Sequence, residues 1–225
     1  MKDTVCIYSG GMDSFTLVNE IARADRLHSC LSFNYGQRHS KELRYAARGA
    51  AHLGVPHHVI DLTALAPHLL GSALTDSASV QLPEGHYAND NMKLTVVPNR
   101  NMIMLSVAIA YAVSHKLLRV CYGAHGGDHT IYPDCRPEFV ELMHSAALIA
   151  NWHPVAVEAP YLKLDKAAIL KIGYRLGLDY RDAWTCYAGG QYACGRCGSC
   201  RERLEAFQLI GKEDPLQYEG EESAA

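Results

Sequence analysis

The chain has 225 residues, a length that suits one α/β domain with a small additional module. Its 48% hydrophobic and 20% charged residues exclude intrinsic disorder, collagen and coiled coil. With 21 basic residues against 24 acidic ones, the net charge is −3, so no overall basic field attracts nucleic acid. The longest apolar stretch, residues 102–113, is shorter than the roughly 20 residues of a membrane span. The first residues show no secretory apolar segment, and we expect a cytoplasmic protein without membrane or nucleic-acid partners.

Short apolar runs alternate with helical patterns along the chain. Strands are predicted at residues 4–8, 29–34, 57–62, 118–122 and 155–158, and helices at 13–24, 40–53, 100–115, 136–150, 166–176 and 202–210. Asn99 and Asp165 are the expected N-caps of the third and fifth helices. This alternation predicts an α/β fold: a doubly wound, mostly parallel five-stranded sheet with helices on both faces.

The composition of the segments predicts how the chain is organised into regions. Residues 63–95 are rich in Ser, Gly, Pro and Asp and too long for an ordinary connection, which predicts a partly ordered flap beside a site. We expect an α/β domain at 1–180, a cysteine-containing module and helix at 181–211, and a frayed, solvated acidic tail at 212–225.

Four segments follow the carboxyl ends of predicted strands: residues 9–14, 34–39, 123–134 and 160–166. In open parallel sheets, ligands bind beyond these strand ends. We therefore expect all four segments to line one crevice.

Residues 9–14, Ser-Gly-Gly-Met-Asp-Ser, join the first strand to the first helix. Glycines let the backbone approach a ligand, and the free N–H groups of a helix start attract an anion. The segment lacks the lysine of a P-loop and the spacing of the dinucleotide fingerprint. It resembles the SGGxDS loop of the N-type ATP pyrophosphatases, the PP-loop family. This resemblance implies that Ser9, Gly10, Gly11, Met12, Asp13 and Ser14 bind ATP, which is cleaved between its α- and β-phosphates.

Cys186, Cys194, Cys197 and Cys200 crowd into one short segment. The two-residue spacing of the last three lets neighbouring thiolates reach one ion at about 2.3 Å. Four thiolates make a closed, structural zinc site. An iron–sulfur cluster also uses four cysteines, but zinc is favoured because nothing else in the chain suggests redox chemistry. Cys135 is expected to be a semi-buried thiol beside the pocket.

The PP-loop and the cysteine cluster occur together with three further motifs, Tyr-Gly-Gln-Arg-His at 35–39, Val-Pro-Asn-Arg-Asn at 97–101 and Tyr-Pro-Asp-Cys-Arg-Pro-Glu-Phe at 132–139. Jointly these closely resemble the 7-cyano-7-deazaguanine synthase family of the queuosine pathway, over roughly residues 3–210. Asn99 stands where many members have glycine, and His129 and Ile131 stand where many have tyrosine and glycine. The resemblance implies an adenine nucleotide alpha-hydrolase-like fold and a homodimer.

The implied activity is that of an ATP-dependent ligase. It converts 7-carboxy-7-deazaguanine and ammonia to 7-cyano-7-deazaguanine through an adenylated acid and an amide, with Mg²⁺ as cofactor. Three alternatives remain: a variant that stops at the amide, a PP-loop thiouridylase that modifies tRNA, and a non-catalytic nucleotide sensor. The acidic net charge and the lack of a separate basic domain disfavour the tRNA enzyme.

Several polar residues near strand ends are candidate catalytic or binding groups. Arg100 opens a helix, where a cation opposes the dipole, and is a candidate clamp for phosphate or carboxylate. Asp128 and Asp134 suit Mg²⁺ or the amidine-like edge of a guanine analogue. Lys166 resembles the phosphate-site lysine of PP-loop enzymes, with Lys163 as the competing choice. The catalytic set is Asp13, Arg100, Asp128, Asp134 and Lys166, and Tyr35 and Arg38 join the loop in binding nucleotide.

Overall fold

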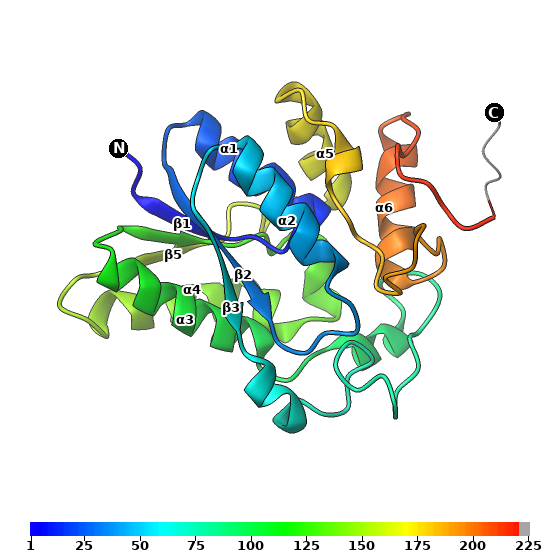
Figure 1. The fold of residues 1–225 in the computed structure, drawn as a ribbon, viewed down its shortest axis with the longest axis horizontal. Coiled ribbons are helices and arrows are strands. Elements are labelled where there is room, and N and C mark those ends of the chain that lie inside the picture. Colours follow the sequence, from blue (N-terminus) through cyan, green and yellow to red (C-terminus); the bar gives the residue numbers. More distant parts are fainter. Residues whose placement is uncertain (221–225) are drawn as a thin grey trace.

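A computed structural model describes residues 1–220 and shows a three-layer α/β fold (Figure 1). Within these residues the central sheet contains β1 (Thr4–Ile7), β2 (Leu27–Asn34), β3 (His57–Asp61), β4 (Arg119–Cys121) and β5 (Ala156–Glu158). The strands lie in the order β3-β2-β1-β4-β5, and every pairing is parallel. The doubly wound, five-stranded parallel sheet predicted from the sequence is confirmed.

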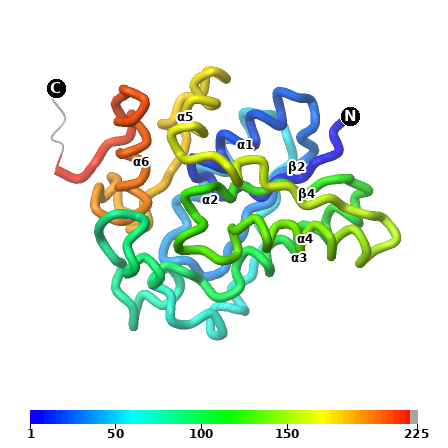
Figure 2. Tube along the Cα trace, turned by 180° about the vertical axis from the view of Figure 1, so that it is seen from behind, coloured from blue at the N-terminus to red at the C-terminus, as the bar shows by residue number. Residues whose placement is uncertain are grey.

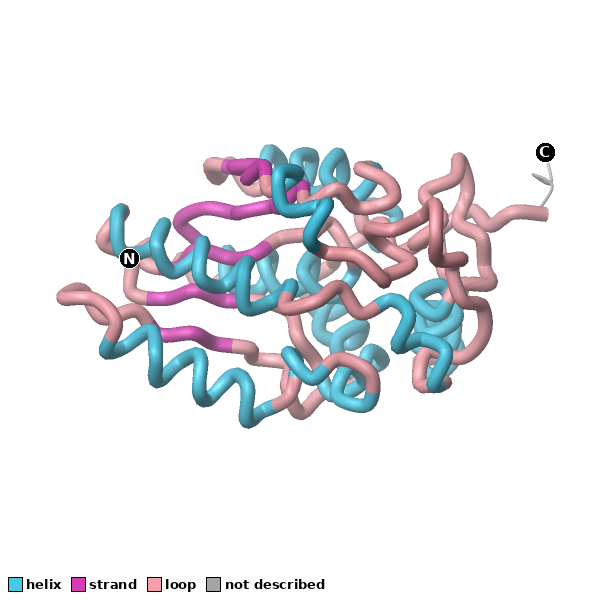
Figure 3. The backbone as a smooth tube through the Cα atoms, turned by 90° about the horizontal axis from the view of Figure 1, so that it is seen from below, coloured by secondary structure: helices cyan, strands magenta, loops and turns pink. Residues whose placement is uncertain are grey.

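The helices of the described chain are α1 (Met12–Arg23), α2 (Lys41–His52), α3 (Arg100–Ser114), α4 (Pro137–Ile149), α5 (Lys166–Arg175) and α6 (Gly198–Leu209). α3 and α4 cover one face of the sheet, and α1, α2 and α5 cover the other (Figures 1 and 3). Neighbouring residues of a strand contribute to opposite faces of the sheet, because their side chains point alternately to one face and the other. Thus Val5 packs with α3, whereas Cys6 packs with α1 and α5.

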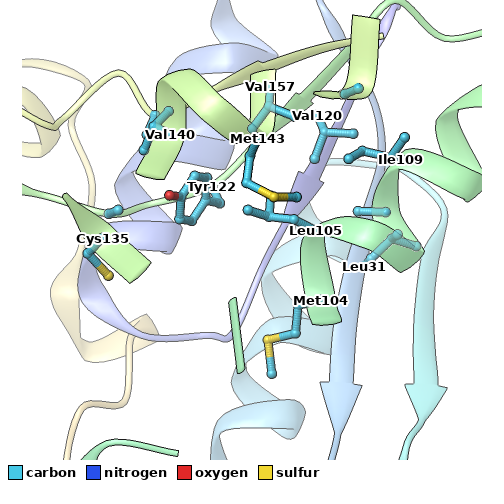
Figure 4. Close-up of a cluster of buried hydrophobic side chains, with 14 of the residues drawn as sticks. Leu31, Met104, Leu105, Ile109, Val120, Tyr122, Cys135, Val140, Met143 and Val157 are labelled. Carbon is cyan, nitrogen blue, oxygen red and sulfur yellow. The ribbon is translucent and has the colours of Figure 1, made fainter. Parts of the chain in front are cut away.

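A buried apolar cluster joins the sheet to α3 and α4 (Figure 4). Leu105 and Ile109 of α3 and Met143 of α4 meet Val120 and Val157 on the strands. The central strand β1 is buried by apolar residues on both faces, as expected of a parallel sheet that helices cover twice. This packing fixes the strand ends, and with them the loops that carry the polar residues.

Residues 63–95 contain two 3₁₀ helices, Thr63–His68 and Asp90–Thr95, and bury Leu69, Leu74 and Met92. Figures 1 and 2 show this segment lying against the chain that leads into α6. Glu84 forms an antiparallel bridge with Cys197, and the N–H of Gly85 donates to the carbonyl of Arg196 at 3.1 Å. The segment expected to be a partly ordered flap is therefore packed against the cysteine cluster.

Residues 212–220 pack against α6. The Asp214 carboxylate accepts hydrogen bonds from Nε and Nη2 of the fully buried Arg203, at 2.6 and 2.8 Å. Tyr218 is also buried, and the N–H of Ala193 donates to the carbonyl of Gln217 at 2.9 Å. The expectation of a frayed, solvated tail is wrong for residues 212–220. The last part of the predicted tail, 221–225, lies outside the described residues.

Two boundaries differ from the sequence prediction. α6 starts at Gly198 rather than 202, because Cys197 stands at its N-cap and Cys200 lies in its first turn. Asn99 precedes α3 but has a left-handed backbone, with φ at 55°, and its side chain forms no capping bond. The Asp134 carboxylate instead accepts from the N–H of Asn101 at 3.0 Å. The predicted N-cap position of Asn99 is confirmed, but its side chain does not cap the helix, because the carboxylate of the distant Asp134 accepts this N–H instead.

Within residues 1–220, none of the helices combines the length and the apolar character that crossing a bilayer requires.

Candidate active site

One cleft lies beyond the carboxyl ends of the strands. Each of the four segments predicted to line a crevice contributes to it, with Ser9, Gly11, Met12, Asp13 and Ser14 from the first, Tyr35 and Arg38 from the second, Asp128 from the third and Lys166 from the fourth. Of the other predicted site residues, Arg100 lines the cleft, whereas Gly10 and Asp134 do not. Gly10 packs against α2, and Asp134 accepts a hydrogen bond from the first turn of α3. The shared location predicted from strand ends is confirmed.

Residues 9–14, called the phosphate loop here for their resemblance to the PP-loop, combine a glycine at positive φ with a helix start that no side chain caps. Gly10 has φ at +89°, and a Cβ there would lie 2.3 Å from the carbonyl oxygen of Glu42. Gly11 stands at the N-cap of α1 and offers no side-chain acceptor. The first N–H groups of a helix have no intrahelical acceptor, so this helix start suits an anion. Ser9 and Ser14 add hydroxyl groups, whose oxygens are 3.0 Å apart.

A buried lysine lies beside the loop among carboxylates. Lys166 is 6% exposed, and its Nζ lies 2.5 Å from Oε2 of Glu202 and 3.3 Å from Oδ2 of Asp13. Burial alone would lower the pKa of Lys166, but the charges of Asp13, Glu202 and Asp128 outweigh it and raise this pKa. The ammonium is therefore held charged and oriented at the start of α1.

His125 is buried at the centre of these groups, although sequence reasoning did not single it out. Its Nδ1 accepts the N–H of Gly127 at 3.1 Å, which places the ring proton on Nε2. Nε2 lies 3.6 Å from Asp128, 3.8 Å from Asp13 and 4.0 Å from Glu202. Its position after a strand was the available sequence signal.

Asp128 is held from two directions. Its carboxylate accepts the hydroxyl proton of Tyr87 at 2.9 Å and the N–H of His125 at 3.1 Å. Tyr87 lies in the segment 63–95 and lines the cleft. No sequence signal pairs this tyrosine with Asp128, because the two are brought together by tertiary packing.

Glu202 was also missed. It belongs to α6, two residues after Cys200, and its side chain is 13% exposed. A Cβ on Gly127 would lie 2.8 Å from its Oε1, so the carboxylate is enclosed by the loop after β4. The cysteine-rich module thus places a charged group directly behind Lys166, which lines the cleft.

Arg100 lines the cleft beside Tyr35, and Asp134 lies near it. Burial would lower the pKa of Arg100, but the nearby Tyr35 and Asp134 raise it, so the guanidinium keeps its charge. Burial also raises the pKa of the neighbouring Cys135, whose sulfur accepts from the side-chain amide of Asn101 at 3.3 Å. A protonated thiol is a poor nucleophile, which argues against sulfur transfer at this position.

Glu42, in the first turn of α2, is a further cleft residue that the sequence did not reveal. Burial raises the pKa of this carboxyl from 4.5 to about 7, and the charge of Arg100 opposes the shift. The cleft therefore contains a carboxyl group that changes its charge near neutral pH.

The cysteine cluster brings four sulfur atoms within 4.8 Å of one another, all from buried residues. Tetrahedral Zn²⁺ with bonds of about 2.3 Å requires sulfur separations near 3.8 Å, and the Cys194 and Cys200 sulfurs are 4.0 Å apart. The N–H groups of Arg196 and Cys197 donate to the Cys194 sulfur at 3.4 and 3.3 Å. Because thiolates at these distances repel unless a cation joins them, the donor set fits a metal ion. The predicted clustering of the four cysteines in a geometry that can bind one metal ion is confirmed.

The family of this chain follows from comparison with known proteins. A family profile described as "Queuosine biosynthesis protein QueC" matches residues 3–211. The chain belongs to this family. A 7-cyano-7-deazaguanine synthase of Hahella chejuensis is 60% identical over 215 residues, with 96% of this chain and 92% of the relative covered. One of Marinobacter nauticus is 58% identical over 221 residues, covering 97% and 99%. The family resemblance seen in the sequence is confirmed.

A solved structure gives an independent view of the fold. NMN synthetase from Francisella tularensis superposes with a TM-score of 0.52 at 12% identity, covering 94% of this chain and 78% of that chain. At this identity the similarity supports the fold alone, and it agrees with the parallel α/β sheet described above.

Proposed function

We propose that this QueC family member makes 7-cyano-7-deazaguanine from 7-carboxy-7-deazaguanine and ammonia at the cleft, with ATP as the activating reagent. The observation that carries the proposal is the uncapped start of α1 beside a buried, charged Lys166. An anion-binding loop and an oriented cation at one point suit the pyrophosphate that leaves during adenylation.

The chemistry needs activation twice. A substrate carboxylate oxygen attacks the α-phosphate, pyrophosphate leaves, and the acyl-adenylate forms. Ammonia attacks the carbonyl carbon, AMP leaves and a proton is lost, which gives the amide. The amide oxygen then attacks the α-phosphate of a second ATP and pyrophosphate leaves. Loss of AMP and of both N–H protons of the amide nitrogen gives the nitrile.

In this proposal different residues of the cleft bind the phosphates and the substrate carboxylate. Ser9, Gly11 and Ser14 bind phosphate oxygens, and Lys166 stabilises the charge on the leaving pyrophosphate. Arg100, charged and beside Tyr35, binds the substrate carboxylate before activation. Asp134 orients Arg100 from behind through its place at the start of α3.

Mg²⁺ has suitable ligands in the same cleft. The Oδ1 atom of Asp13 is buried and has no hydrogen-bond partner among residues 1–220. The carboxylates of Asp13 and Asp128 lie 3.8 and 3.6 Å from the same atom, Nε2 of His125. Hard carboxylate oxygens are the ligands that Mg²⁺ prefers. Asp13 and Asp128 would hold the ion, which neutralises phosphate charge when bound.

Zn²⁺ is the metal we assign to the cysteine cluster. Four buried thiols in a closed arrangement leave no place for a reactive water, so its role is to fix the chain around residues 186–200. Metal analysis of purified protein should give one zinc per chain. Iron with acid-labile sulfide would contradict the assignment.

The deciding experiment follows products by mass spectrometry. Enzyme with ATP, Mg²⁺, ammonium and 7-carboxy-7-deazaguanine should give the nitrile together with AMP. Lys166→Met should lower kcat by at least about 100-fold because the oriented cation is lost, whereas the surface variant Lys171→Met should retain activity. Accumulation of the amide would favour the amide-stopping alternative, and lack of turnover in the zinc-loaded wild type would contradict the function.

We also propose a cytoplasmic homodimer. The exposed side of α4 and the loop after it present Leu142, Ile149 and Trp152 to solvent, and such an apolar surface suits a second copy of the chain. Sedimentation of the wild type should give the mass of a dimer, and Ile149→Lys should shift it toward the monomer.

A further inference from the structure

We propose that Glu202 is a positioning residue for the adenylation steps: it holds the Nζ of Lys166 at the phosphate loop and makes that position depend on the cysteine cluster. The inference rests on the role of Lys166 in the proposed function. Glu202 does not line the cleft and reaches the reaction through the lysine.

The contact between Glu202 and Lys166 is short and enclosed. Oε2 of Glu202 lies 2.5 Å from Nζ, and the two side chains are 13% and 6% exposed. Charge-assisted hydrogen bonds of this kind fix direction as well as charge. Asp13 contacts the same ammonium at 3.3 Å, so the lysine is held between a residue of the phosphate loop and a residue of α6.

The position of Glu202 is set by the turn that contains two cysteines. Cys197 is the N-cap of α6, Cys200 lies in its first turn, and Glu202 follows two residues later. α6 lies beside α5 (Figures 1 and 2), whose first residue is Lys166. A metal that joins the cysteines would thus fix the backbone from which Glu202 reaches the lysine.

The segment 63–95 strengthens this arrangement from the other side. A Cβ on Gly198 would lie 2.6 Å from the Met92 sulfur and 3.4 Å from Tyr87, so the first turn of α6 is packed tightly against that segment. The ring of Tyr87 also faces Lys166, with Nζ 5.6 Å from its centroid. Lys166 therefore has little freedom while the module is intact.

The test compares Glu202→Gln with Glu205→Gln. Glu205 is on the same helix, but its carboxylate is 44% exposed and pairs with His86 at 3.2 Å. Glu202→Gln should lower kcat by 10- to 100-fold, because misplacing a charged group by about 1 Å has effects of this size. Its KM for ATP should not rise, because one negative charge is removed near the phosphates, and ATP should still bind one per chain. Glu205→Gln should match the wild type in kcat, in KM for ATP and in the number of ATP molecules bound per chain.

A second readout does not depend on turnover. Acetylation of the Lys166 amine by acetic anhydride, followed by mass spectrometry of its peptide, should be at least 3-fold faster in Glu202→Gln than in the wild type or Glu205→Gln. Removal of the metal from the wild type by a chelator should raise the rate in the same way, because the anchored carboxylate is released.

Wild-type kcat in Glu202→Gln would overturn the inference. So would a loss of bound zinc or of ATP stoichiometry in that variant, because Glu202 would then only maintain the fold. If Lys166→Met is inactive while Glu202→Gln is fully active, the inference fails and the proposed function stands. If Lys166→Met is fully active, the role given to Lys166 fails as well.

Discussion

Single residues at and beside the cleft have strongly constrained conformations, and Gly10, next to the lining residues Ser9 and Gly11, is the clearest example. Its φ of +89° disfavours any side chain, and an added Cβ would meet both the carbonyl of Glu42 and the N–H of Ala46. The glycine allows α2 to pack against the phosphate loop. The sequence motif indicated a glycine that lets the backbone approach a ligand, whereas at Gly10 the structure shows a close contact within the protein.

Gly10→Ala should therefore destabilise the protein and abolish ATP turnover. We expect the free energy of unfolding to fall by about 3 kcal/mol or more, since α2 must move away from the loop. Gly54→Ala is the control, because Gly54 also has positive φ but open space around it, and it should cost only about 1 kcal/mol. Denaturant unfolding of both variants measures the difference, and equal losses would contradict the packing explanation.

Glu42 makes a pH-dependent contribution to stability. Its pKa is raised from 4.5 to about 7 in the folded chain, so the folded state binds more protons than the unfolded state between these values. The free energy of unfolding contributed by this group must then fall as pH rises from about 4.5 to about 7.

Glu42→Gln removes that dependence. The free energy of unfolding of the variant minus that of the wild type should be about 1–2 kcal/mol higher at pH 8 than at pH 5. This value is reduced for the partial exposure of the side chain. Urea unfolding at both pH values tests this, because histidine titrations cancel in the difference. A difference that is the same at both pH values would mean that the Glu42 carboxyl titrates normally.

At the scale of elements, the start of α3 shows how a helix end can be set by a distant segment. Local sequence suggested Asn99 as the cap, since Asn is favoured there. The Asn99 backbone is instead left-handed, and Asp134 supplies the acceptor for the N–H of Asn101. The loop after β4 therefore determines how α3 begins and how Arg100 enters the cleft.

Asp134→Ala should lower the free energy of unfolding by about 1–2 kcal/mol through loss of this cap. Asn99→Gly should be neutral or stabilising by up to about 1 kcal/mol, because glycine adopts the left-handed backbone without strain. Thermal unfolding of the two variants distinguishes the alternatives. If Asn99→Gly lost much stability and Asp134→Ala lost none, the Asn99 side chain would be the cap, as predicted from sequence.

At the scale of the whole molecule, the C-terminal segment closes the structure around Arg203. This arginine is completely buried and donates to Asp214 and to the carbonyls of Tyr180 and Ala183. A buried charge of this kind depends on its partner, since an unpaired one is strongly destabilising. Residues 212–220 thus belong to the folded unit rather than to a solvated tail.

Asp214→Ala should destabilise the protein by about 3–5 kcal/mol, because the guanidinium of Arg203 stays buried without its carboxylate. Glu213→Ala, its exposed neighbour in the sequence, should change stability by less than about 0.5 kcal/mol. Calorimetric melting of both variants provides the measurement. Similar melting temperatures would mean that Asp214 does not stabilise the fold.

The sequence alone determined the sheet, the phosphate loop, the cysteine cluster and the family. These features depend on local spacing: apolar runs mark strands, glycines mark the loop, and cysteines two residues apart reach one ion. Strand ends even predicted that Asp13, Asp128 and Lys166 meet, because parallel strands end at one edge.

Only the tertiary structure decided what surrounds those groups. Glu202 and Tyr87 reach the site from helices and loops far away in sequence, and Asp134 replaces the cap expected at Asn99. Nothing in the local sequence specifies such partners, because a carboxylate or hydroxyl can pair with any donor that packing brings near it. The charge interactions and hydrogen bonds of the cleft residues thus depend on distances that are set by the packing of the helices and loops on the sheet.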